Sequence, residues 1–394
     1  MKKCMFVLLI LSLFLTGCWD RRELNELGIT LAIGIDKVED EYQITAQVVV
    51  PSEISTKTST GRSPVTLFQE KGETVYEAFR KITKISPRKI YPGHLRMLVL
   101  GEDLAKEGIA KSLDLLSRDW ELRSDFFVVI AKDMTAGEVL NVTTTIENIP
   151  ANKMFSTLKM SEANWAATQG FTLDELITDL TSDGKEAVLT GILVIGEQEM
   201  GSSKQNVESI SPPARIKYDE LAVFKKDKLV GWLTERESRG YNGIVNKVKN
   251  SVIAISCPKE GKATIEIIQL HSKMKGKINK GKPKVDINIK VKGNVGEVEC
   301  QINLNDQETI VELEKKTEKK MKETINLAIK TAQKQYNSDI FGFGEAIHRS
   351  NPKEWKKLKE SWDEVFPEML ANVKVDVKLE HTETEGNSFL KEVK

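Results

Sequence analysis

KVDINIKVK, residues 284–292, alternates polar and apolar side chains along its whole length. A period of two predicts a β-strand with one buried face and one face in water. Apolar side chains also recur in residues 265–270 and 373–379, on either side of this stretch in the chain. Since one-sided strands belong to sheets that helices cover on a single face, we expect the last third of the chain to fold as an α+β domain.

Two helices are expected between these strands. Residues 313–336 carry an apolar stripe that ends at Tyr336, and their Lys and Glu side chains are interpreted as a solvated face. Asn351 before Pro352 is a good start for a second helix, which Pro367 should end. Its stripe of Trp355, Leu358, Trp362 and Val365 predicts core packing, which is favoured over a sugar platform or partner patch.

Towards the N-terminus, helical and strand patterns alternate. A capping box at Thr172 and Glu175 and another at Thr234 and Glu237 each predict the start of a helix. Residues 52–64 are rich in Ser and Thr and are expected to form a mobile loop. Strands are expected at 29–35, 42–50, 95–100, 126–130 and 188–195, a hairpin at 221–224 and 229–233, and helices at 73–85 and 109–120.

The length of 394 residues suggests two or three domains, at roughly 150 residues per domain. Residues 196–215 are polar and contain Gly, Ser and Pro, so a change of domain is expected just before them. The expected division is a signal peptide at 1–17, an N-terminal α/β domain at 18–190, a small middle domain at 191–256, a C-terminal α+β domain at 257–384 and a flexible tail at 385–394.

The first residues have the pattern of an export signal. Two lysines precede an apolar run at 5–15, which is followed by Leu15-Thr16-Gly17-Cys18. The run is shorter than the roughly 20 residues that span a bilayer, so the segment should be removed. The last four residues resemble the lipobox of bacterial lipoproteins, in which the cysteine becomes the mature N-terminus and carries S-diacylglycerol and an N-acyl chain. An ordinary secretory signal with an incidental cysteine is the alternative.

The chain has four cysteines, and Cys4 and Cys18 lie in or beside the leader. Cys257 and Cys300 could pair outside the cell. Each lies beside an apolar, strand-like run, where a small buried thiol is common, so unpaired thiols are favoured. The chain is not a disulfide scaffold.

Charge and histidine spacing argue against several classes of function. Lys and Arg number 58, as do Asp and Glu, so no net charge favours nucleic acid. The four histidines show no metal-ligand spacing, and His94 is interpreted as satisfying a local hydrogen bond rather than as a base. The glycines of residues 341–344 are interpreted as a turn. We expect no catalytic residue, metal or cofactor.

Short segments spread over nearly the whole chain point to one family. They are GCWDRREL at 17–24, AIGIDK at 32–37, HLR at 94–96, GEDLA at 101–105, RDWELR at 118–123 and DIFGFG at 339–344, with Pro352, Trp355 and Trp362. Together they resemble GerAC-type, or Ger(x)C, spore germination lipoproteins.

The resemblance implies three domains of mixed α/β type without an active site. It implies the C subunit of a germinant receptor, working beside integral-membrane A and B subunits in the spore inner membrane. Cys18 would hold this subunit to the lipid bilayer on the outer, non-cytoplasmic face. Small-molecule germinants would be sensed by the complex, and Cys18 is the only functional position that the resemblance assigns.

Two other functions remain open. A solute-binding lipoprotein of an importer would share the anchor but needs two matched lobes around a ligand. The last third of the chain differs from the first, which counts against this class. An envelope hydrolase would need a base and nucleophile or a metal, and no such group is apparent in the sequence.

Overall fold

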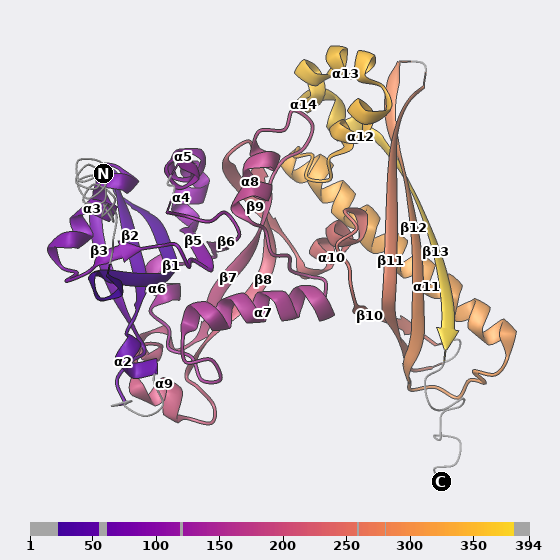
Figure 1. Ribbon diagram of the computed structural model, residues 1–394. Coiled ribbons are helices and arrows are strands. Elements are labelled where there is room, and N and C mark those ends of the chain that lie inside the picture. Colours follow the sequence, from indigo (N-terminus) through magenta and orange to yellow (C-terminus); the bar gives the residue numbers. More distant parts are fainter. Residues whose placement is uncertain (1–22, 55–60, 119–120, 258–259, 280, 382–394) are drawn as a thin grey trace, which may run out of the picture.

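The computed structural model describes residues 23–54, 61–118, 121–257, 260–279 and 281–381. Two β-sheets stand side by side with helices packed on both, so the expected mixed α/β class is confirmed (Figure 1). The predicted signal peptide, Cys18 and the predicted tail at 385–394 lie outside the described residues, as does the middle of the loop expected at 52–64. Among the described helices, none is long and apolar enough to cross a bilayer.

The first sheet has the order β3-β2-β1-β5-β6-β7-β8-β9, and the short strand β4 adds to the start of β1. Strands β1, β5, β6 and β7 are parallel, whereas β2, β3, β8 and β9 pair antiparallel at the two edges. The strands are β1 (Leu27–Val38), β2 (Glu41–Val49), β3 (Val65–Gly72), β4 (Lys89–Tyr91), β5 (Met97–Gly101), β6 (Phe127–Ala131), β7 (Val188–Gly196), β8 (Ala214–Lys225) and β9 (Lys228–Leu233).

Helices cover both faces of this sheet, because parallel strands are joined by crossover helices. On one face lie α6 (Ala136–Leu140) and α7 (Pro150–Asn164). The central strand β5 is therefore buried along its whole length, as its continuous apolar run predicts. The other face carries α3 (Val75–Lys81), α4 (Glu102–Glu107), α5 (Ala110–Arg118), α8 (Leu173–Leu180) and α10 (Glu235–Ile244).

Both predicted capping boxes are confirmed. The hydroxyl of Thr172 accepts from the amide of Glu175, whose carboxylate accepts from the Thr172 amide, and α8 follows. At the start of α10, the hydroxyl of Thr234 likewise accepts from the amide of Glu237, and the Glu237 carboxylate accepts from the Thr234 amide. Each box satisfies two N–H groups that the first helical turn leaves without partners. Shorter pieces are α2 (Pro51–Ile54), α9 (Lys204–Glu208), η1 (Leu24–Glu26), η2 (Ile82–Lys84) and η3 (Gln198–Met200).

The second sheet has the order β10-β11-β12-β13, with β13 parallel to β12 and the other pairs antiparallel. Its strands are β10 (Ser251–Ser256), β11 (Lys262–Asn279), β12 (Lys282–Val298) and β13 (Leu370–His381). One face is buried under α11 (Gln307–Lys330) and α12 (Phe343–Ser350), as the alternation in residues 284–292 predicts. A bulge between Ile267 and Gln269 keeps Leu270 on the buried face.

The single helix expected from Pro352 to Pro367 is wrong. The chain forms α13 (Pro352–Leu358), a 3₁₀ turn at Lys359–Ser361, α14 (Trp362–Val365) and a second 3₁₀ turn at Phe366–Glu368. A 3₁₀ turn winds more tightly than an α-helix and so redirects the stripe. The predicted core role of Trp355 and Trp362 is confirmed, since they are 2% and 5% exposed and their rings meet edge to face at 5.2 Å.

The boundary expected between residues 190 and 191 falls inside β7. This strand pairs with β6 on one side and with β8 on the other, so β8 and β9 extend the first sheet. Buried apolar side chains also form a continuous cluster that reaches from this sheet into the second one. The division into three domains stays a prediction.

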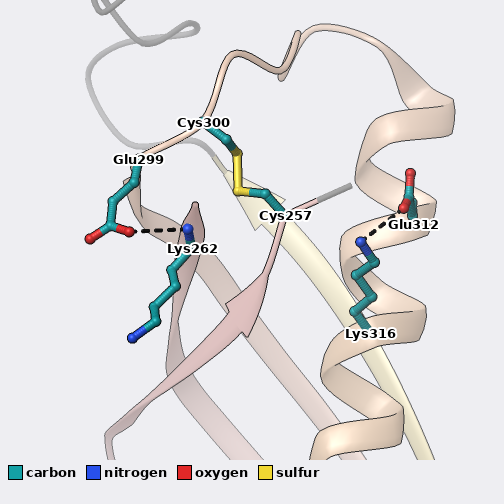
Figure 2. Close-up of a disulfide and its surroundings, with 6 residues drawn as sticks. All are labelled: Cys257, Lys262, Glu299, Cys300, Glu312 and Lys316. Atoms are coloured by element: carbon teal, nitrogen blue, oxygen red, sulfur yellow. Dashed lines mark hydrogen bonds and ion pairs between the residues drawn. A yellow bond between two sulfur atoms is a disulfide. The ribbon is translucent and has the colours of Figure 1, made fainter. Parts of the chain in front are cut away.

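The favoured interpretation of Cys257 and Cys300 as unpaired thiols is wrong, because the two form a disulfide (Figure 2). Cys257 follows β10 and Cys300 follows β12, and β11 pairs with both strands near its own start. The pairings Ser256 with Lys262 and Ala263 with Val298 carry the cysteines to one end of the sheet, with Cα atoms 6.4 Å apart. The two cysteines meet because strands that are distant in the sequence pair with one another. The periodicity of a segment does not reveal which strand it pairs with.

Candidate functional site at the junction of the two sheets

The predicted lipidation site, Cys18, lies outside the described residues, which begin five residues later at Glu23. Strand β1 follows from Leu27, and its first residues pair with β4.

A cleft with a volume of about 460 Å³ lies between the two sheets. We call it the junction groove. Its floor is apolar, and its rim carries the basic side chains of Arg236, Lys262 and Lys320 with the acidic side chain of Glu235. The floor consists of Val248, Ile253, Ile255, Ile267, Leu270, Met321 and Ile325, contributed by α11, by β10 and β11, and by the chain before β10.

Arg239 of α10 is the most enclosed cation of the groove. It donates to the Ser251 hydroxyl at 2.8 Å and to the Val252 carbonyl, and its guanidinium lies 4.9 Å from the centre of the Trp165 ring. Burial lowers the pKa of this guanidinium below its ordinary value, and an arginine still remains charged at neutral pH. The groove can thus hold a ligand with an apolar body and a negatively charged group.

Close backbone contact and polar bonds fix the two sheets to each other beside the groove. A Cβ atom on Gly240 of α10 would lie 2.7 Å from the Thr324 carbonyl oxygen of α11, so only glycine permits this approach. After α11, the π-helical turn Thr331–Tyr336 continues towards the first sheet. The Tyr336 hydroxyl donates to the Trp232 carbonyl at 2.7 Å, and the Thr331 hydroxyl donates to Glu237.

Asp339 follows Tyr336 by three residues and is buried, with 3% of its surface exposed. It accepts from the amides of Phe343 and Gly344, at 3.0 and 2.8 Å, and from the Trp362 indole at 3.1 Å. Burial raises its pKa to about 7, although hydrogen bonds from the backbone of Gly342, Phe343 and Gly344 and from the Trp362 indole lower it. Its carbonyl accepts from the Glu186 amide at 2.9 Å, which links α12 to the first sheet.

The turn expected at residues 341–344 is confirmed for its first half, where Gly342 has a φ of 73°, whereas Phe343 and Gly344 already belong to α12. Sequence reasoning did not identify Asp339 as the side chain that holds the turn. The signal in the sequence was an acidic residue four positions before Phe343, the first residue of α12, because acidic side chains near a helix start can accept from its free amides. A perturbed pKa also occurs at catalytic groups, but the bonds of Asp339 all serve the fold.

An acidic cluster lies at the carboxyl ends of β1, β5 and β6, where parallel sheets often bind ligands. Asp36 accepts from the amides of Ala136 and Gly137, at 2.7 and 3.0 Å, and burial raises its pKa above the ordinary value. Glu102 accepts from the Asp133 amide at 2.6 Å and pairs with Lys106. These carboxylates fix the start of α6 and the β6 loop, so their bonds are accounted for without a ligand.

The histidines are scattered over the described residues. His94 is exposed and makes an edge contact with the Tyr91 ring, while His271 and His348 are also exposed. Over the part of the chain that is described, no group of three or more His, Cys, Asp or Glu side chains could hold a metal ion. The junction groove offers binding chemistry, and the structure gives no reaction to assign to it.

Comparison with known families gives matches in both halves of the chain. The family described as "Spore germination protein N-terminal domain" matches residues 20–194. The family described as "Spore germination B3/ GerAC like, C-terminal" matches residues 219–383. The two matches together leave few residues of the chain uncovered.

Relatives of similar length are found in Bacillus subtilis strain 168. Spore germination protein KC is 31% identical, with 98% of this chain and 97% of the relative covered. Spore germination protein A3 is 28% identical, with 95% of each chain covered. The solved crystal structure of the GerBC protein superimposes with a TM-score of 0.53 at 20% identity, covering 89% of this chain and 96% of that one. This last likeness concerns the fold alone.

Proposed function

Since this chain belongs to the GerAC family of spore germination proteins, we propose that it is the lipid-anchored, non-catalytic C subunit of a germinant receptor. The subunit assembles with the integral-membrane A and B subunits and takes part in nutrient-triggered germination. It lies on the outer, non-cytoplasmic face of the spore inner membrane. The complex senses the small-molecule germinant.

Similarity over the whole chain carries this proposal. The match to protein KC covers 98% of this chain and 97% of the relative, so the resemblance is not that of a shared domain in an otherwise different protein. The lipobox-like residues 15–18 support the anchor, because two acyl chains hold a protein firmly where one holds it marginally. Binding surfaces without an evident reacting group fit a subunit that acts by assembly.

The importer alternative is disfavoured by the two sheets. A solute-binding lipoprotein closes two similar lobes around its ligand. Here one sheet runs through β1 to β9 with parallel centre strands, while the other consists of β10 to β13 and is covered on one face. The junction groove lies between unlike units.

Deletion of the gene tests the germination role. In a strain without paralogous receptors, we expect loss of the response to at least one nutrient, and recovery when the gene is returned. Pull-down of the tagged subunit from spore membranes should recover the A and B subunits. A normal response to every nutrient in the deletion strain would contradict the proposal.

The variant Cys18→Ala tests the anchor. Without the thiol no thioether to diacylglycerol can form, so the precursor should take up no labelled fatty acid and should not be retained stably at the membrane. Cys4→Ala is the matched control, because Cys4 lies in the same leader outside the lipobox-like residues. Normal fatty acid incorporation into the Cys18→Ala variant would rule the anchor out.

A further inference from the structure

The segment from Tyr76 to Tyr91 concentrates positive charge. It contains five basic residues and a single acidic one, whereas the whole chain has 58 of each sign. The segment forms α3, the turn η2 and strand β4. The chain as a whole has no net charge, but this segment is locally basic, as is the lysine-rich stretch at residues 273–284. We call the surface of the segment from Tyr76 to Tyr91 the basic patch. The patch consists of Tyr76, Arg80, Lys84, Ile85, Arg88 and Lys89.

Two of these cations are free to bind something else. Among the described residues, Lys84 and Arg88 have no carboxylate within ion-pair distance, while neighbouring Lys89 pairs with Glu121 at 2.8 Å. Ile85 lies between the two free cations and is 48% exposed. An exposed apolar side chain flanked by cations suits the boundary between lipid headgroups and acyl chains.

A cleft of about 400 Å³ adjoins the patch, between α3 and α5. Tyr76 stands at its edge and is 49% exposed, as is typical of aromatic side chains at a membrane interface. Arg80, Lys89 and Arg118 also contribute to its lining. Its apolar walls consist of Phe79, Ile90, Pro92, Leu115, Leu116 and Leu122.

The patch lies beside the start of the described chain. Lys89 of β4 is the strand partner of Leu27, and a Cβ atom on Gly28 would lie 3.7 Å from the Arg88 Cβ. Glu23 comes five positions after Cys18, and an extended chain of that length spans at most about 18 Å. An acyl chain on Cys18 would keep Glu23 within that distance of the bilayer, and Leu27, the strand partner of Lys89, follows four residues later.

From the short tether and the unpaired cations, we infer that the basic patch docks on the anionic phospholipid headgroups of the membrane. This inference rests on the proposed anchor at Cys18. Lys84 and Arg88 bind headgroup phosphates, and Ile85 enters the interface between them. Docking orients the first sheet at the membrane and leaves the second sheet, with α13 and α14, pointing away from it (Figure 1).

Anionic lipid is the occupant that the charges select. Each Lys or Arg at such a surface strengthens membrane binding about fivefold, and the attraction falls off within about 8 Å at physiological salt. Reversing two charges should weaken docking by about 25-fold or more. A neutral bilayer would hold the lipidated chain but would not orient it.

The test measures lysine acylation by an amine-reactive reagent on the full chain isolated from membranes. The chain is mixed with phosphatidylglycerol-rich or pure phosphatidylcholine vesicles, the vesicles are pelleted, and labelled peptides are quantified by mass spectrometry. Lys84 should react several-fold more slowly on the anionic vesicles. Lys357 of α13, whose side chain is 71% exposed, should react equally on both.

Two double variants of equal charge change sharpen the test. In the Lys84→Glu, Arg88→Glu variant, acylation is measured at Lys89, because Lys84 is gone. Its rate should be the same on anionic and neutral vesicles, while the chain still pellets through its anchor. Lys315→Glu with Lys319→Glu, on the exposed face of α11, should leave the protection of Lys84 intact. Loss of protection in both variants would show a net-charge effect and overturn the patch.

The outcomes separate the patch from the anchor. Pelleting with both vesicles and equal Lys84 labelling overturns the patch and leaves the anchor standing. Pelleting with anionic vesicles alone, with Lys84 protected, supports the patch and contradicts the anchor. A chain that pellets with neither vesicle overturns both.

Discussion

Removing the disulfide between Cys257 and Cys300 should destabilise the second sheet substantially. The bond joins the ends of β10 and β12, and its two cysteines are separated by 43 residues (Figure 2). For a loop of this length, the chain-entropy relation gives about 4 kcal/mol at 25 °C, because the cross-link restricts the unfolded chain. Both cysteines are buried, so alanine is the suitable replacement, because it leaves no buried polar group without a hydrogen-bond partner.

Urea unfolding of the Cys257→Ala, Cys300→Ala double variant measures this effect. Its free energy of unfolding should be about 4 kcal/mol lower than that of the wild type. Dithiothreitol should lower the free energy of unfolding of the wild type by the same amount and should not change that of the variant. Ser256→Ala, at an exposed neighbouring position, is the matched control and should stay within about 0.5 kcal/mol.

Two results would refute this reasoning. Equal unfolding midpoints for the wild type and the double variant would show that the cross-link does not limit the unfolded chain. Alkylation of both thiols in folded, non-reduced protein would show that the bond is not formed.

Three further changes probe the junction and the C-terminal core. Burial raises the pKa of Asp339 from 3.8 to about 7, so the stability that its protonation adds is complete below pH 3.8 and lost as pH rises towards 7. Asp339→Asn should therefore flatten the fall in unfolding free energy across that range, and an unchanged slope in urea unfolding would contradict it. Trp362→Ala should lower the free energy of unfolding by about 3 to 5 kcal/mol, because the side chain is only 5% exposed. Trp165→Ala is the control and should cost much less, because Trp165 is 38% exposed. Equal melting temperatures for the two variants would contradict the buried role of Trp362. A Cβ atom on Gly184 would lie 2.7 Å from a backbone nitrogen of α12, so Gly184→Ala should cost about 1 to 3 kcal/mol by calorimetry, whereas the open position of Gly243 makes Gly243→Ala a tolerated control. Equal stability of the two glycine variants would mean that α12 does not pack there.

Features that depend on local sequence were predictable. The alternation at 284–292 and 373–379 matches the one-sided second sheet, and the capping boxes at Thr172 and Thr234 open helices as expected. Each of these patterns reports how neighbouring residues face solvent or core, which is a property of a few residues at a time. The family resemblance was likewise visible in short segments and is confirmed by matches over the whole chain.

The candidate sites could be predicted only in part. Cys18 was found from its leader and stays a prediction, because it lies outside the described residues. The junction groove was missed because Arg239, Ile255 and Met321 come from three elements that periodicity treats separately. A groove exists only once those elements have packed.

The sequence by itself therefore determined the alternating strands of the second sheet, the capping boxes, the buried role of Trp355 and Trp362 and the family, whereas the leader stays a prediction. Only the tertiary structure decided that β7 continues into β8 within one sheet, that Cys257 meets Cys300, and that Asp339 ties α12 to the first sheet. The reason is physical: periodicity records which side of an element is buried, whereas the identity of its neighbour depends on pairing between residues far apart in the chain.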